Sequence, residues 1–131
     1  MSRPCPCTSK KTYDACCEPY VSGRRPPETA AQLMRSRFTA YALGKVDYLI
    51  ATTAAEERAK LDREDLAQYC RSVRCISLKI LSTELGGAGD ETGVVRFQAS
   101  LQFNGRRTLH LEKSRFVREE GRWVYVDGET N

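Results

Sequence analysis

Four cysteines near the N-terminus are the residues whose spacing most clearly permits chemistry. Cys5, Cys7, Cys16 and Cys17 form a Cys-x-Cys-x8-Cys-Cys pattern. Thiolates are soft ligands, and four of them at such short separation can surround one zinc ion as a tetrahedron. The segment is poor in apolar residues, so ligation would have to supply the free energy that orders it. The pattern therefore predicts zinc as cofactor, bound by all four sulfurs in a structural or docking site.

Three alternatives to zinc remain open for this cluster. A disulfide pair needs an oxidising compartment, whereas we find no leader segment and no apolar run of membrane-spanning length. Iron–sulfur clusters usually have wider cysteine spacings, and the four thiols could also carry no ligand. We expect a cytoplasmic protein. Cys70 and Cys75 would be either a redox pair or, as we favour, two packed apolar side chains.

The rest of the chain must position these residues, and its periodicity changes from helical to extended part-way along. Residues 28–43 carry apolar side chains at a spacing of three to four, which predicts a helix, and shorter helices are expected over 46–51 and 62–70. Alternation from residue 75 onward predicts strands that include 94–103, 106–118 and 122–127. Asn104-Gly105 is a strong hairpin signal, and Glu120-Gly121 marks a second turn. Helices followed by antiparallel strands predict an α+β fold class.

The two hairpins also assign side chains to the faces of the sheet. Pairing across 104–105 and 120–121 places most apolar side chains on one inner face, together with a few polar ones. The candidate ligand-binding residues on this face and on the facing helix are Arg37, Tyr41, His110, Glu112, Ser114, Tyr125 and Asp127. In one interpretation they line a sheet–helix cleft for a small polar ligand, with His110, Glu112 and Asp127 as candidate acid–base catalysts. In the other, which we favour, Arg37 pairs with Glu112 or Asp127 in an internal network.

The cysteine pattern resembles the SEC-C motif, the zinc knuckle at the C-terminus of the SecA translocation ATPase and on many unrelated proteins. The resemblance implies that the four N-terminal cysteines are zinc ligands. The motif usually has glycines around its serine, whereas Thr8 and Lys10 flank Ser9 in this chain.

Further segments, in order along nearly the whole chain, resemble the YchJ family. They are residues 16–23, 33–37, 47–50, 112–116 and 121–128. The resemblance implies a SEC-C knuckle over residues 1–23 and a nuclear-transport-factor-2-like (NTF2-like), cystatin-like α+β domain over 28–131, with helices packed on a curved antiparallel sheet. Many members have Trp-His after the segment 47–50, where this chain has Thr52-Thr53-Ala54. The family has no established activity, so the resemblance implies a fold and zinc and leaves the reaction open.

Charge and motifs together leave two function classes. We expect a docking or interaction module whose knuckle engages a protein or ribosomal partner, because residues 1–50 hold 8 Lys and Arg against 4 Asp and Glu. The alternative is a small-molecule-binding protein or acid–base enzyme that uses the sheet–helix cleft. Specific nucleic-acid binding is not expected, because no aromatic platform accompanies the basic hairpin tip at 104–107. No interaction with a membrane is expected.

Overall fold

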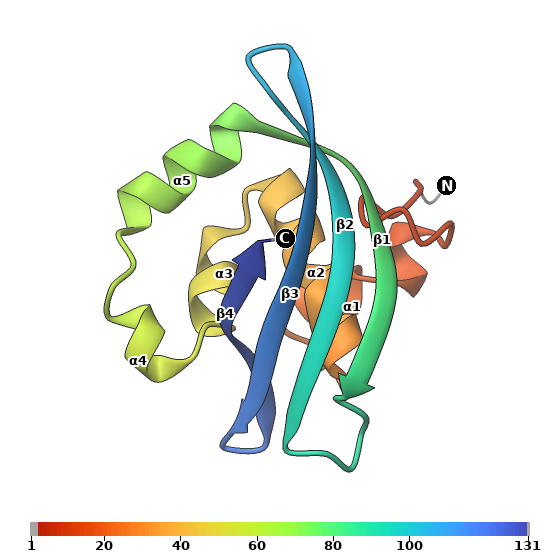
Figure 1. The fold of residues 1–131 in the computed structure, drawn as a ribbon, viewed down its shortest axis with the longest axis vertical. Helices are drawn as coiled ribbons and strands as arrows, with labels where there is room; N and C mark the ends of the chain where they lie inside the picture. The colour runs from red at the N-terminus through yellow and green to blue at the C-terminus, as the bar shows by residue number, and fades with distance from the viewer. Residues whose placement is uncertain (1–2, 131) are drawn as a thin grey trace.

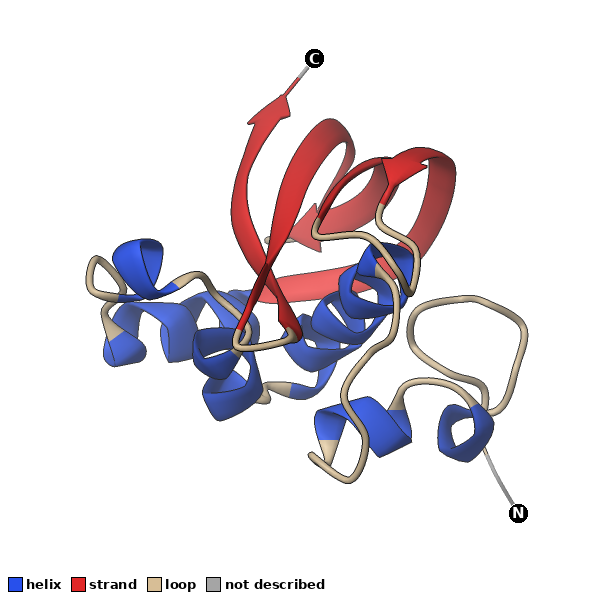
Figure 2. Ribbon diagram, turned by 90° about the horizontal axis from the view of Figure 1, so that it is seen from below, coloured by secondary structure: helices blue, strands red, loops and turns tan. Residues whose placement is uncertain are grey.

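A four-stranded antiparallel sheet forms one layer of the protein, and the helices form the other. The computed structural model describes residues 3–130 (Figure 1). Strands β1 (Val73–Leu85), β2 (Thr92–Phe103), β3 (Arg106–Glu119) and β4 (Arg122–Thr130) follow one another across the sheet in sequence order. Figure 2 shows the sheet curving over the helices, with the N-terminal loop beside them. The predicted α+β fold, with helices packed on an antiparallel sheet, is confirmed.

Within residues 3–130, six helical segments precede the sheet. They are the 3₁₀ turn η1 (Tyr13–Ala15), α1 (Glu18–Val21), α2 (Ala30–Leu43), α3 (Val46–Ala51), α4 (Ala55–Arg58) and α5 (Arg63–Ser72). None of the helices within residues 3–130 is long and apolar enough to cross a membrane.

Helix α2 is the central helix, and its first turn explains where it begins. Thr29 and Gln32 form a capping box: the Thr29 Oγ1 accepts from the Gln32 backbone N–H at 3.1 Å, and the Gln32 Oε1 accepts from the Thr29 N–H at 3.2 Å. Gly44 ends the helix in the left-handed region at φ 71°. One face of α2 buries Leu33 and Phe38 in the hydrophobic core, which also contains inner-face residues of the sheet.

Both predicted hairpin turns are present, and their backbone angles explain their sequences. Asn104 and Gly105 have φ of 50° and 79°, and Glu120 and Gly121 have φ of 53° and 81°. Two consecutive left-handed residues are typical of the type I′ turn, whose twist matches that of the flanking strands. The first hairpin pairs Ala99 with His110, as the turn position predicts.

The second hairpin contains a register shift between Arg115 and Phe116 that changes the predicted faces. Simple pairing from the turn would place Asp127 opposite Ser114, but the shift places Gly128 there and pairs Asp127 with Arg115. The Asp127 carboxylate accepts from the Arg115 Nε at 2.7 Å and from its Nη2 at 2.5 Å, and both side chains are exposed. The prediction that Asp127 lies on the inner face is therefore wrong, because one added residue in β4 turns it to the outer face.

Candidate functional site

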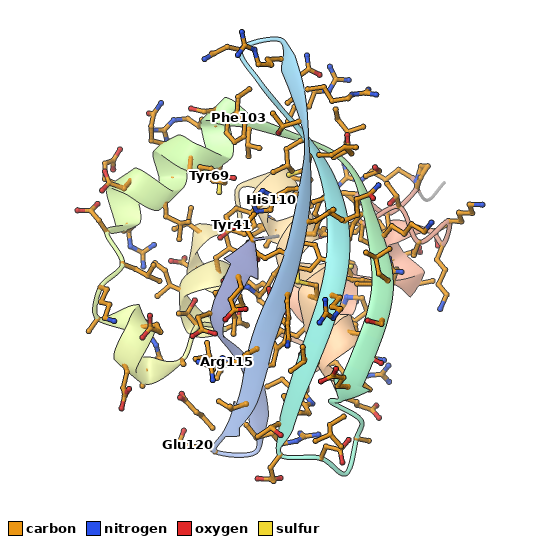
Figure 3. All side chains as sticks on the ribbon, viewed as in Figure 1. Tyr41, Tyr69, Phe103, His110, Arg115 and Glu120 are labelled. Carbon is orange, nitrogen blue, oxygen red and sulfur yellow. The ribbon has the colours of Figure 1, made fainter. Side chains whose placement is uncertain are left out.

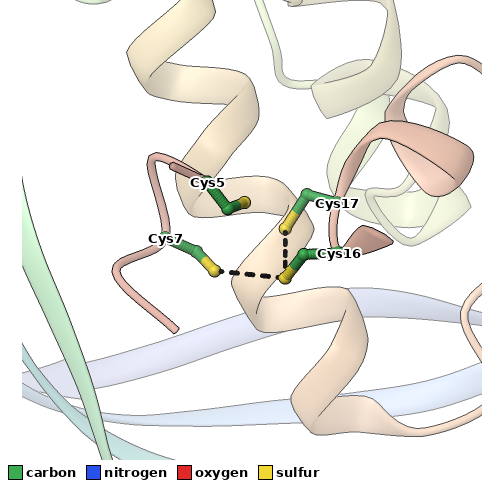
Figure 4. A group of neighbouring side chains, drawn as sticks. All are labelled: Cys5, Cys7, Cys16 and Cys17. Atoms are coloured by element: carbon green, nitrogen blue, oxygen red, sulfur yellow. Dashed lines mark hydrogen bonds between the residues drawn. The ribbon is translucent and has the colours of Figure 1, made fainter. Parts of the chain in front are cut away.

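The four predicted cysteine ligands converge into one cluster. Their Sγ atoms all lie within 4.8 Å of one another (Figure 4). The Cys16 Sγ lies 3.6 Å from the Cys7 Sγ and 3.9 Å from the Cys17 Sγ. A tetrahedral zinc–thiolate centre with bonds of about 2.3 Å has sulfur–sulfur edges of about 3.8 Å. The cysteines form no disulfide, so the cluster has the donor type and spacing to hold such a metal ion.

Hydrogen bonds inside the cluster change the acidity of its thiols. The hydrogen bond with the Cys17 thiol lowers the pKa of Cys7 to about 4, outweighing the burial that raises it. The same hydrogen bond, with burial, raises the pKa of Cys17. Metal ligation requires thiolates, and the cluster already favours one at Cys7.

The cluster is built into the domain and does not project from it. Cys5, Cys7 and Cys17 are at most 3% exposed. The Cys5 Sγ lies 3.6 Å from the Thr39 Oγ1 on α2. Arg35, also on α2, donates from its Nη1 to the Cys7 carbonyl at 3.3 Å and to the Cys7 Sγ at 3.8 Å. Arg35 therefore places a positive charge beside the sulfurs. The sequence pattern of the helix did not predict this role for Arg35.

The loop between the two cysteine pairs has an unusual backbone. Thr8 and Lys10, which stand where the SEC-C motif usually has glycines, adopt left-handed φ values of 60° and 77°. The Thr8 Oγ1 accepts from the Leu78 N–H at 3.0 Å, and its single proton is shared between the Cys7 carbonyl at 2.7 Å and the Leu78 carbonyl at 3.1 Å, so it ties the loop to β1. Lys10 and Lys11 are exposed.

A cavity of about 320 Å³ lies between the inner face of the sheet, α2 and α5. Part of its lining is apolar, contributed by Met34, Phe38, Phe97, Ala99 and Leu101. Six of the seven predicted ligand-binding residues also line it: Arg37, Tyr41, His110, Glu112, Ser114 and Tyr125. Asp127, on the outer face, does not. The sheet and the first long helix therefore bring together most of the side chains selected from the sequence.

Three polar side chains on β3 form a hydrogen-bonded row along the cavity wall. The Ser114 Oγ donates to the Glu112 Oε2 at 3.0 Å, and the Glu112 Oε1 lies 3.0 Å from the His110 Nε2. Gly128 leaves the room that this carboxylate occupies: a Cβ there would lie 2.6 Å from the Glu112 Oε2. A carboxylate that orients an imidazole can support proton transfer to or from a neighbouring molecule. Sequence reasoning missed Gly128 because the register shift was not predictable.

Arg37 reaches the cavity from α2 and is only 6% exposed. Its Nη1 donates to the Leu49 carbonyl at 3.0 Å and to the Thr52 and Thr53 hydroxyls at 2.8 Å and 3.3 Å. Its guanidinium carbon lies 4.7 Å from the centroid of the Tyr125 ring. Thr52 and Thr53 therefore help to orient this arginine.

The ion pairs that we favoured for Arg37 do not form. None of the ion pairs among residues 3–130 includes Arg37. Glu112 binds His110 and Ser114, and Asp127 binds Arg115 on the opposite face. Burial lowers the pKa of the guanidinium.

Aromatic rings line the cavity from Arg37 outward. Tyr41 follows Arg37 by one helical turn on α2, and its ring meets that of Tyr69 on α5 edge-on, with centroids 5.6 Å apart. The centroid of the Tyr69 ring lies 5.5 Å from that of Phe103 on β2. Figure 3 shows these rings and His110 gathered between α5 and the end of the sheet that carries the first hairpin. Tyr69 was missed because its helix is short and no residue pattern in it indicated that this side chain faces the sheet.

Comparison with known proteins agrees with this architecture. A family model described as the middle NTF2-like domain of YchJ matches residues 29–128. The chain belongs to the YchJ family. A UPF0225 protein of Pectobacterium carotovorum is 42% identical over 131 residues, covering 98% of this chain and 84% of the relative.

Solved structures also resemble this YchJ family member over its knuckle and its domain. A SEC-C motif containing protein from Rhodopseudomonas palustris has a TM-score of 0.89 and 34% identity, covering 98% of this chain and 99% of that one. Another, from Psychrobacter arcticus, has a TM-score of 0.83 at 23% identity, covering 98% and 83%, and shares the fold. The resemblance to SEC-C and YchJ proteins that the sequence carries is confirmed.

Proposed function

We propose that the cysteine cluster binds a structural zinc ion that fastens the N-terminal segment to α2 and β1. The support is the separation of the four sulfurs, which fits a tetrahedral centre, and their burial against Thr39 and Arg35. Four protein ligands leave no coordination position for a substrate. The metal therefore stabilises the fold, and we place the functional site elsewhere.

We further propose that this site is the cavity and that the protein binds a small molecule in it. The observation that carries the proposal is a space of about 320 Å³ that combines an apolar lining with several converging polar side chains. Ligand sites typically have a volume of roughly 300–1,000 Å³ and this mixture of surfaces. If the ligand has an exchangeable proton, the His110–Glu112 pair is placed to transfer it.

The test uses N-phenyl-1-naphthylamine, a neutral dye that fluoresces in apolar sites. Thr108 lines the cavity and is exposed, so Thr108→Trp should block the entrance and weaken dye binding by about tenfold or more. Leu109→Trp is the matched control, because Leu109 is the next residue on β3, faces outward and is 67% exposed. It should leave binding unchanged. Absence of binding to the wild-type protein, or equal losses in both variants, would contradict the proposal.

A docking role for the knuckle is the second candidate, and one observation favours it. Lys10 and Lys11 are exposed on a loop whose backbone is fixed, since the Cys5 N–H donates to the Lys11 carbonyl at 2.9 Å. A fixed pair of cations suits an acidic surface on a protein or on the ribosome.

Co-sedimentation with purified ribosomes tests this second candidate. Reversing both charges, Lys10→Glu with Lys11→Glu, should abolish co-sedimentation and leave zinc content and thermal stability unchanged. Arg106→Glu with Arg107→Glu, two exposed charges at the first hairpin, is the control of equal charge change. Equal losses in both double variants would show attraction by net charge alone, and no binding by the wild-type protein would exclude a ribosomal partner.

A further inference from the structure

Arg37 presents an unusual electrostatic situation inside the cavity. The side chain is 6% exposed, and its partners among residues 3–130 are neutral: a backbone carbonyl, two threonine hydroxyls, the Tyr41 hydroxyl and the Tyr125 ring. A buried charge without a counter-ion costs free energy, because neutral hydrogen-bond partners replace only part of its hydration. Buried arginines are therefore expected to face a carboxylate, and this one does not.

The carboxylate that shares the cavity is already engaged. One oxygen of Glu112 accepts from Ser114 and the other lies 3.0 Å from His110, with Gly128 giving the group its room. Glu112 is thus oriented along β3 and forms no ion pair with Arg37. The guanidinium of Arg37 and the carboxylate of Glu112 therefore line the same cavity without pairing with each other.

The donors of Arg37 also remain available. Three hydrogen bonds of the guanidinium use Nη1, whereas the group carries five N–H donors, three of them on Nε and Nη2. Arg37 lines the cavity, and no side-chain nitrogen in residues 3–130 is both buried and unpaired. The Tyr41 hydroxyl is a further hydrogen-bond partner of the guanidinium, and the donors that it does not use are open to a molecule that enters.

We propose that the ligand of this cavity is an amphipathic organic anion, whose carboxylate-like group binds the free donors of Arg37 and whose aromatic or apolar body lies along Tyr41, Tyr69 and Phe103. This inference rests on the proposed small-molecule function and names the ligand class. A planar guanidinium binds a carboxylate or a similar oxyanion through two parallel hydrogen bonds. The row of rings leads from Arg37 toward the first hairpin at centroid spacings of 5.6 and 5.5 Å, which suits an apolar body.

Two dyes with the same ring skeleton test the inference on the zinc-loaded full chain. 1-Anilinonaphthalene-8-sulfonate carries one sulfonate, which N-phenyl-1-naphthylamine lacks. The wild-type protein should bind the anionic dye at least about tenfold more tightly than the neutral one. Arg37→Gln should remove this preference and leave the affinity for the neutral dye. Arg96→Gln removes the same charge from the exposed outer face and should leave the preference unchanged.

The outcomes separate the two levels of proposal. If neither dye binds, the small-molecule function itself fails. If both dyes bind equally to the wild-type protein, or if the preference survives Arg37→Gln, the anion inference is overturned and the small-molecule function stands. Loss of the preference in Arg96→Gln would also overturn it, since the sulfonate would then be on the outer face.

A second measurement covers the case in which Arg37→Gln does not fold. In the wild-type protein, the NMR signal of the Arg37 Nε–H should shift on addition of the anionic dye and stay in place with the neutral one. An unchanged signal with both dyes would show that Arg37 has only the structural role of holding α3 to α2, and would overturn the inference.

Discussion

At the scale of single residues, Glu112 shows how neighbouring side chains determine the role of a half-buried carboxylate. Ser114 and His110 each bind one of its oxygens, and Gly128 on β4 provides the space in which the carboxylate lies. Because both oxygens are occupied, the carboxylate orients His110 and does not neutralise Arg37. The row on β3 thus supplies a candidate proton-transfer group, and α2 supplies the separate cationic group.

Gly128→Ala tests whether this arrangement depends on the space at Gly128. The added Cβ would lie 2.6 Å from the Glu112 Oε2 and 3.1 Å from the Ser114 Oγ, so the carboxylate must move and break its hydrogen bonds. We expect the free energy of unfolding to fall by about 1–2 kcal/mol and the NMR signals of the His110 ring to shift.

Gly89→Ala is the control for this substitution, because a Cβ at Gly89 meets nothing within 4 Å. It should leave both the stability and the His110 signals unchanged. Unchanged His110 signals in Gly128→Ala would contradict the role given to this glycine.

At the scale of elements, the knuckle loop combines a strained backbone with two cysteine pairs. Thr8 and Lys10 both have left-handed φ, which costs about 1–2 kcal/mol for a residue with a Cβ. Thr8 recovers part of this cost through its two hydrogen bonds to Leu78 on β1. Lys10 is exposed and makes no comparable contact with a strand.

Lys10→Gly should therefore stabilise the protein. Glycine adopts φ of 77° without strain, and this gain exceeds the extra conformational entropy that it loses on folding. We expect the free energy of unfolding to rise by about 0.5–1 kcal/mol, measured by thermal or denaturant unfolding of the zinc-loaded protein.

Lys11→Gly is the matched control, since Lys11 has the same charge and exposure but no left-handed backbone. It should lower the free energy of unfolding by about 0.5–1 kcal/mol. If Lys10→Gly destabilised the protein as much as Lys11→Gly does, the backbone at Lys10 would carry no strain worth relieving.

The elements themselves were largely predictable from the sequence. The helix expected over 28–43 is observed as Ala30–Leu43, the one expected over 46–51 as Val46–Ala51, and both hairpins turn where their Gly-containing pairs predict. These features depend on local periodicity and turn chemistry. Asp127 was misplaced because a register shift is decided by how β4 packs, and no residue type marks it. The burial of Arg37 without a carboxylate likewise depends on tertiary packing that periodicity does not describe.

At the scale of the whole molecule, the knuckle and the domain share one hydrophobic core. Cys5, Cys7 and Cys17 belong to the same buried cluster as Leu33 on α2 and Leu78 on β1. The N-terminal segment is short of apolar residues, so it contributes to this core only if its four sulfurs are held together. Metal binding is therefore expected to affect the stability of the domain as well as the order of the loop.

Removal of the metal with a strong chelator tests this coupling. The protein would lose the two Thr8–Leu78 hydrogen bonds and the contact of Arg35 with Cys7, which contribute roughly 1 kcal/mol each. For a chain of this size the thermal midpoint should fall by on the order of 10 °C. Amide exchange should accelerate over residues 3–23 and at Leu78, while the centre of the β2–β3 hairpin stays protected.

A double substitution, Cys70→Ser with Cys75→Ser, distinguishes loss of the metal from loss of thiols in general. Both residues are half-buried, free cysteines outside the four-sulfur cluster. This variant should keep about one zinc per chain and the same fall in midpoint on chelation, whereas Cys7→Ser should lack the metal and already show the lower midpoint. A midpoint that did not change on chelation would mean that the knuckle stays packed on α2 and β1 without a metal, and that the four sulfurs serve the fold by burial alone.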